Sequence, residues 1–209
     1  MIRILIADDH EVVRRGLKQI LAETPDMVVT DEAARGEEVL DKVSSKDFDV
    51  VLLDISMPGK TGLEVMKQLR SIRPQLPVLV LSIYPEEQYA VRVLKAGASG
   101  YLTKESAPEE LISAIRKVSS GRKYITPSLA EKLAQQLDYT SERPLHETLS
   151  DREYQVMVMI ASGKAVKNMA ESLSLSVKTV STYRSRILEK MGMKSNAELI
   201  RYAIQNNLL

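Results

Sequence analysis

Apolar and polar residues alternate in blocks over the first half of the chain. Five short apolar runs, each typical of a buried strand, fall at residues 2–7, 27–33, 49–53, 77–82 and 100–103. After each run, apolar residues recur every three or four positions, which is the spacing of one face of a helix. Strands and helices that alternate in this way predict an α/β fold, a doubly wound parallel sheet of the (βα)5 type.

The pattern changes after residue 148, where only helical spacing is found. Ser150 with Glu153 and Ser195 with Glu198 have the spacing of capping boxes, which begin helices. Between them, "VKNMAESL", the turn "SLS" and "VKTVSTYRSRILEKM" predict a helix-turn-helix within an all-α domain of four helices. The apolar residues of the longer helix are expected in the core; they are Val177, Val180, Ile187, Leu188 and Met191.

The stretch between these patterns is predicted to be a linker that contains one helix. Thr126 before Pro127 is a helix start, and the residues from 138 to 148 are polar and typical of a flexible tether. His146 is interpreted as a solvated linker residue. The chain is therefore divided into a first domain, a linker and a second domain, which span residues 1–120, 121–148 and 149–209.

Charge supports a division into two unlike halves. Of the 209 residues, 1–120 contain 16 Lys and Arg against 19 Asp and Glu, whereas 149–209 contain 9 against 5, a net charge of +4. A basic C-terminal part favours a polyanionic partner. The chain has no cysteine, which excludes disulfides and thiolate metal sites. The apolar run at the N-terminus is too short for a signal peptide or a membrane span, so we expect a cytoplasmic protein without a membrane partner.

Polar residues end four of the five predicted strands. Asp8 and Asp9 follow the first, Asp54 the third, Ser82 ends the fourth and Lys104 follows the fifth. Asp54 by itself could be a turn residue. In a parallel sheet, however, the carboxyl ends of the strands share one edge, where ligands bind.

This edge predicts a metal and phosphate site. Three carboxylates in one pocket repel each other, and a divalent cation relieves the repulsion. Oxygen ligands without His or Cys favour Mg²⁺ or Mn²⁺. Lys104 adds a positive charge, Ser82 adds a hydroxyl, and Asp54 could form an aspartyl phosphate.

The set resembles the receiver domain of two-component response regulators over residues 1–120, through Asp8-Asp9, "LLDISMPGKTG", "VLVLS" and "GYLTK". The resemblance implies that Asp54 is the phosphoacceptor. It also implies Mg²⁺ bound by Asp9, Asp54 and the backbone carbonyl of Ser56, with Asp8 acting partly through water. Ser82 and Lys104 would contact the phosphoryl group.

Two residues of the fifth strand and its loop need separate comment. Tyr101 resembles the aromatic partner of Ser82 in the receiver switch, although it could also be an ordinary half-buried strand aromatic. Glu105 stands where many receivers have a proline with a cis bond. Because a cis bond before a non-proline residue costs about 3 kcal/mol, the sequence leaves the geometry of the Lys104–Glu105 bond open.

The polar face of the longer C-terminal helix combines cations with small hydroxyl residues. Such a mixture suits phosphate contacts and close approach to base edges, but it is also compatible with a solvated basic face. The whole segment, with "LSDREYQVM" and "KSNAEL", resembles the LuxR-type output domain of the NarL/FixJ family. The residues that the resemblance places against DNA are Lys178, Thr179, Ser181, Thr182, Arg184, Ser185, Arg186 and Lys190.

Within this set, the resemblance places Ser181, Thr182 and Ser185 against bases and the cations against phosphates. Tyr183 stands where a histidine is expected, and its role is open. The last helix offers Ile200, Ala203 and Ile204 to the core or to self-association.

Together the two halves predict a phosphorylation-activated, DNA-binding transcription regulator rather than a conventional enzyme. The partners implied are a sensor histidine kinase, promoter DNA, a second copy of the chain on activation and, as a further possible contact, RNA polymerase. Two alternatives stay open: a magnesium-dependent phosphatase or phosphotransferase, and a DNA-binding protein with a vestigial receiver.

Overall fold

The protein is described by a computed structural model that covers residues 1–138, 144–206 and 208–209. The chain divides into two compact units, Met1–Leu133 and Ala134–Leu209, and each is described by itself. Within the described residues, no helix is long and apolar enough to cross a membrane.

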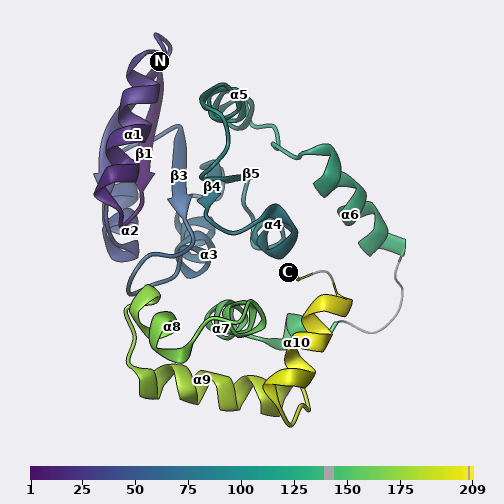
Figure 1. The fold of residues 1–209 in the computed structure, drawn as a ribbon. Helices are drawn as coiled ribbons and strands as arrows, with labels where there is room; N and C mark the ends of the chain where they lie inside the picture. The colour runs from purple at the N-terminus through teal and green to yellow at the C-terminus, as the bar shows by residue number, and fades with distance from the viewer. Residues whose placement is uncertain (139–143, 207) are drawn as a thin grey trace. The chain divides into compact units, whose positions relative to one another are not determined.

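The first unit is built on a five-stranded parallel sheet (Figure 1). The strands are β1 (Ile2–Ala7), β2 (Met27–Ala33), β3 (Val50–Asp54), β4 (Val78–Ser82) and β5 (Gly100–Thr103), and their order is β2-β1-β3-β4-β5. The order reverses between β1 and β3, where a doubly wound sheet opens a crevice for ligands. The predicted (βα)5 parallel sheet is confirmed.

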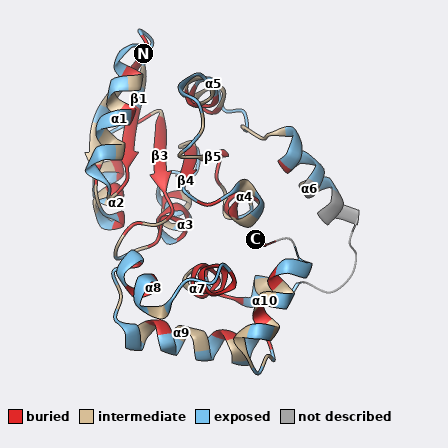
Figure 2. Ribbon diagram, viewed as in Figure 1, coloured by how far each residue is buried: buried red, intermediate tan, exposed pale blue. Residues whose placement is uncertain are grey.

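Helices cover both faces of this sheet. They are α1 (Glu11–Ala22), α2 (Gly36–Ser45), α3 (Gly62–Ile72), α4 (Glu86–Lys95) and α5 (Pro108–Ser119). Ile4, Ile6 and Leu52 pack with residues of α1 and α5 on one face. The alternate positions, such as Leu5 and Leu53, are also fully buried, which requires the cover of the other helices (Figure 2). Burial on both faces explains why these strands are continuous apolar runs.

The second unit contains the four helices predicted at its C-terminal end. These are α7 (Asp151–Ala161), α8 (Val166–Ser172), α9 (Val177–Lys190) and α10 (Asn196–Gln205), preceded by a short 3₁₀ helix, η1 (Leu145–Thr148). Ser150 and Glu153 form the predicted capping box, and Ser195 accepts a hydrogen bond from the Glu198 amide. The helix-turn-helix pair α8–α9 is confirmed.

The prediction for Val177 was wrong. Val180, Ile187 and Met191 of α9 are buried, but Val177 is 51% exposed. Val177 is the first residue of α9, and helical side chains lean toward the N-terminus. Its side chain therefore projects past the end of the helix, where helical spacing no longer guarantees a packing partner.

The interpretation of His146 as a solvated linker residue was also wrong. Its ring lies beside two aromatic rings of the second unit, with centroids 6.0 Å from Tyr154 and 5.9 Å from Tyr202. The Tyr202 hydroxyl is 2.9 Å from His146 Nδ1. The end of the predicted tether is thus part of the second unit, while residues 139–143 lie outside the described part of the chain.

Candidate functional site

The predicted pocket residues meet at the carboxyl edge of the sheet. Ala7 of β1 is in register with Leu53 of β3, so Asp8 and Asp54 are neighbours at the strand ends. Both are nearly fully buried, with 1% and 2% of their surface exposed. Lys104, which follows β5, places its Nζ 2.7 Å from Asp54 Oδ2 and 2.6 Å from Asp8 Oδ2. One ammonium group therefore bridges the two buried carboxylates.

Burial and the charge of the ion-pair partner act in opposite directions on the pKa values of Asp54 and Lys104, which with Asp8 form a triad. Burial raises the pKa of Asp54, the Asp8 charge raises it further, and Lys104 only partly offsets these effects. Burial alone would lower the pKa of Lys104, but the two carboxylates outweigh it and raise that pKa. The triad therefore favours a charged lysine and holds Asp54 at a site where a second cation would be stabilising.

Local sequence explains how Asp54 is presented. The loop after β3 turns back, and the Ser56 amide donates to Asp54 Oδ1 at 3.0 Å. Thr61 and Glu64 form a capping box that begins α3 directly behind the loop. Gly62 is required there, since a Cβ would lie 2.2 Å from the Asp54 carbonyl oxygen. The role predicted for the Ser56 carbonyl stays a prediction.

A fourth ligand candidate, His10, was missed by the sequence reasoning. Oxygen and nitrogen atoms of Asp8, Asp9, His10 and Asp54 all lie within 4.8 Å of one another. Asp9 Oδ1 is buried, and His10 Nδ1 lies 2.8 Å from it and can donate to it whenever that nitrogen carries a proton, in the neutral or the charged imidazole. The three carboxylates fit a hard cation such as Mg²⁺. The position of His10 directly after Asp8 and Asp9 in the sequence could have indicated that it lies near the site.

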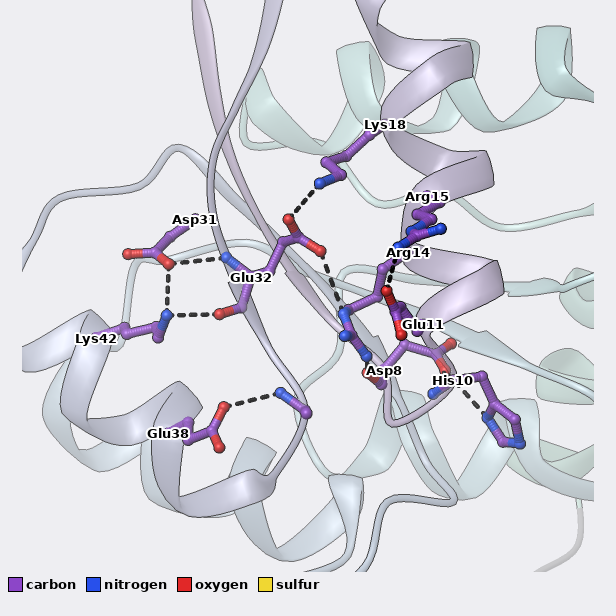
Figure 3. A network of polar contacts seen from close by, with 11 residues as sticks. Asp8, His10, Glu11, Arg14, Arg15, Lys18, Asp31, Glu32, Glu38 and Lys42 are labelled. Carbon is purple, nitrogen blue, oxygen red and sulfur yellow. Dashed lines mark hydrogen bonds and ion pairs between the residues drawn. The ribbon is translucent and has the colours of Figure 1, made fainter.

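Charged residues of α1 and β2 hold Asp8 in place. Arg14 Nη1 donates to the Asp8 carbonyl oxygen at 2.8 Å, and Arg14 Nε donates to Glu32 Oε2 at 3.2 Å (Figure 3). Lys18 also pairs with Glu32, and both cations hold the Glu32 pKa below its usual range, Lys18 more strongly. Arg14 thus ties the end of β1 to α1, a role that the sequence pattern did not indicate.

Ser82 and Tyr101 lie on neighbouring strands, but each contacts the loop between β4 and α4. The Tyr84 amide donates to Ser82 Oγ at 3.1 Å, and the Tyr101 hydroxyl donates to the Tyr84 carbonyl at 2.7 Å. Tyr101 is 1% exposed rather than half-buried, and burial raises its pKa. Both residues predicted as a switch pair are therefore connected through Tyr84.

The loop after β5 begins with a backbone bond from the Lys104 amide to the Ser82 carbonyl at 2.8 Å. None of the described peptide bonds is cis, so the Lys104–Glu105 bond is trans. Pocket geometry in this chain does not depend on the cis bond that proline often supplies.

The predicted DNA-facing residues of α9 fall into two groups. Lys178, Ser181, Thr182, Ser185 and Arg186 are exposed. The hydroxyls of Ser181, Thr182 and Ser185 donate to the carbonyls four residues earlier, at 2.9, 3.0 and 3.2 Å. Because their hydrogens are used in this way, these oxygens face outward as acceptors.

The other predicted contacts on α9 have partners inside the unit. Thr179 bonds Ser176, the N-cap of the helix. Arg184 Nε donates to Asn196 Oδ1 at 2.7 Å. Lys190 Nζ lies 2.6 Å from Glu153 Oε2. Arg184 and Lys190 fix α9 to α10 and α7, and Thr179 fixes its N-terminus; any contact that these residues make with DNA must be added to these bonds.

Both parts of the chain match known protein families. Residues 4–116 match the response regulator receiver domain, and residues 147–203 match the bacterial regulatory proteins of the luxR family. The chain belongs to the two-component response regulators that join these two domains, the NarL/FixJ family. It is a DNA-binding transcription regulator of a two-component system.

Individual relatives extend over the full length. Response regulator UvrY of Escherichia coli K12 is 38% identical over 209 residues, covering 100% of this chain and 96% of its own. Response regulator GacA of Pseudomonas aeruginosa is 38% identical and covers 100% and 98%. Among solved structures, RcsB of Salmonella enterica serovar Typhimurium, bound to promoter rprA with phosphomimetic BeF3⁻, has a TM-score of 0.64, 26% identity and coverage of 97% and 98%.

Proposed function

We propose that Asp54 accepts a phosphoryl group from the phosphohistidine of a sensor kinase and that this modification controls DNA binding by α9. A carboxylate oxygen of Asp54 would attack phosphorus, so that a P–O bond forms as the P–N bond to the kinase histidine breaks. The observation that carries the proposal is the placement of Asp54, a buried carboxylate at the end of β3 that shares the Lys104 ammonium with Asp8.

Asp8, Asp9 and Asp54, with the Ser56 carbonyl, would hold Mg²⁺. When bound, this ion supplies the charge that offsets the approach of an anionic phosphoryl group to three carboxylates. Lys104 would exchange its bond to Asp54 for one to a phosphoryl oxygen. Ser82 would donate its hydroxyl to a second phosphoryl oxygen, and because its Oγ also accepts from the Tyr84 amide, a movement of Ser82 would be passed to the β4–α4 loop.

The phosphorylated protein would bind promoter DNA as a dimer. One α9 helix reaches few base pairs, and its small hydroxyl residues give modest discrimination, so two copies on two half-sites are expected. In one solved structure, two RcsB dimers are bound to two parallel DNAs. The phosphoacceptor domain would span 1–120, the linker 121–148 and the DNA-binding domain 149–209, with residues at each end of the linker bonded to the unit that they adjoin. Such a regulator works beside the chromosome in the bacterial cytoplasm, and RNA polymerase is a further partner to test.

The test is intact-mass measurement after incubation with Mg²⁺ and acetyl phosphate. Wild type should gain one phosphoryl group and Asp54→Asn none, because the nucleophilic oxygen is lost while size and polarity are kept. Asp41→Asn, an exposed carboxyl of α2, is the matched control and should react normally. A normal phosphoryl yield on Asp54→Asn would overturn the assignment, and rapid turnover of small phosphate esters would favour an enzyme instead.

A further inference from the structure

The segment after α5 does not leave the first unit at once. Residues 122–129, named here the clasp, return along the open side of β5. The Tyr124 amide donates to the Ser99 carbonyl at 2.8 Å, and Tyr124 pairs with Gly100 as an isolated parallel bridge. This bridge adds one more chain to the edge of the sheet that carries Tyr101.

Close approach of this chain depends on Gly100. A Cβ at Gly100 would lie 2.8 Å from Tyr124 Cβ and 3.0 Å from the Tyr124 carbonyl oxygen. The Tyr124 side chain packs against the core of the first unit, and its hydroxyl donates to Glu110 Oε1 of α5 at 2.9 Å. Lys117 Nζ lies 5.5 Å from the centre of the Tyr124 ring. The first half of the clasp is therefore fixed to β5 and α5.

The second half of the clasp is fixed to α4. Thr126 Oγ1 lies 2.7 and 2.8 Å from the two carboxylate oxygens of Glu86, the first residue of α4, and donates to that carboxylate. The same oxygen accepts from the Leu129 amide at 3.2 Å and so caps α6 (Pro127–Asp138). Leu129 is 1% exposed. Thus one hydroxyl both starts α6 and ties it to the start of α4.

The two attachment points flank the residues that would move on phosphorylation. Gly100 precedes Tyr101 on β5, and Glu86 follows the β4–α4 loop that contacts both Ser82 and Tyr101 through Tyr84. A shift of Ser82 toward Asp54 would pull on that loop and on the first turn of α4. The Thr126–Glu86 bonds are sensitive to such a shift, because hydrogen bonds weaken steeply with distance and angle.

We propose that the clasp is a phosphorylation-sensitive latch, in which Thr126 holds the start of α6 on Glu86 in the unmodified protein and releases it when Asp54 is phosphorylated. This inference rests on the proposed function of Asp54. Release would free the start of α6, which leads into the second unit. By linkage, loss of the Thr126–Glu86 bonds should also favour the phosphorylated state.

Hydrogen–deuterium exchange of the full-length protein tests the latch, with peptides that cover residues 122–130. Amide exchange there should rise about tenfold in wild type after phosphorylation by acetyl phosphate and Mg²⁺, since bonds to a charged group are worth about that factor. Thr126→Val should show the faster exchange without phosphodonor, and so should Glu86→Ala, which removes the carboxylate but leaves the Thr126 cap on the Leu129 amide in place. Thr126→Ser, which keeps the hydroxyl, should behave as wild type.

Ser128→Ala is the matched control, because it removes an exposed hydroxyl from the same turn of α6. Intact mass confirms phosphorylation of each sample first, so failure of Asp54 to react is separated from failure of the latch. The latch is overturned if phosphorylated wild type exchanges like the unmodified protein. It is also overturned if Thr126→Val has no effect, or if Ser128→Ala loosens the segment equally.

Discussion

The phosphorylation pocket and the outer face of α9 use polar side chains in opposite ways. In the pocket, Asp8 and Asp54 are almost completely buried, and Lys104 lies within 2.7 Å of both. On α9, the hydroxyls of Ser181 and Ser185 are exposed and donate to the backbone of their own helix. The charges in the pocket thus depend on one another, whereas the polar groups on α9 are independent and exposed to a partner.

This difference predicts how each region responds to change. A buried charge that loses its partner is costly, so a substitution in the pocket should act in an all-or-none manner. An exposed cation contributes one phosphate contact among several, so substitutions on α9 should act in graded and nearly additive steps.

The largest expected effect comes from Lys104→Ala. Phosphorylation of Asp54 should still occur. Because the variant has no Lys104 ammonium to bond the phosphoryl group, most of the gain in dimerisation and DNA binding should be lost. Light scattering and DNA binding of phosphorylated samples measure the effect. Lys46→Ala, whose lysine pairs with Asp31 on the surface, should respond normally. A Lys104→Ala protein that is activated like wild type would show that the pocket is not interdependent.

Arg184→Ala should have an intermediate effect. If the guanidinium contacts phosphate, affinity should fall several-fold for all sequences, and the salt slope should decrease by about one unit. Arg201→Ala, an exposed arginine of α10, is the matched control. Because Arg184 also bonds Asn196, the variant Asn196→Ala separates loss of this bond from loss of the phosphate contact. An unchanged salt slope would remove Arg184 from the interface.

Ser150→Ala should destabilise the second unit by about 1 kcal/mol, the usual cost of losing an N-cap side chain. Ser150 and Glu153 bond each other's backbone amides at the start of α7. Urea unfolding followed in the second unit measures the loss, and Ser150→Thr should restore most of it. The yield of phosphorylated Asp54 should not change, because the two regions are built separately.

The smallest expected effect is on the stability of the second unit at low pH, and it comes from Glu153 at the start of α7. Burial alone would raise the pKa of Glu153, but Lys190 and Ser150 outweigh it and hold that pKa below its usual range. A lowered pKa stabilises the folded state above pH about 4.5, and this contribution is lost as the pH falls through the folded-state pKa. Glu153→Gln should therefore flatten the decline in stability on the acid side. An identical acid profile for both proteins would show that the ion pair contributes little.

The order of the elements, and the edge of the sheet at which the pocket lies, follow from the pattern of apolar and polar residues. Apolar runs buried on both faces define strands, and parallel strands bring their carboxyl ends together, so Asp8, Asp54 and Lys104 could be placed at one edge from their positions. Helical spacing and capping signals likewise predicted α7 to α10.

Contacts between distant side chains became visible only in three dimensions. Lys104 bridges two carboxylates that are 46 residues apart in the chain, and Arg14 supports the end of β1. Val177 is exposed because it is the first residue of α9. His146 lies beside two tyrosine rings, and Thr126 bonds Glu86, forty residues earlier in the chain. Periodicity describes the face on which a residue lies, but contacts between distant segments depend on packing that local spacing does not encode.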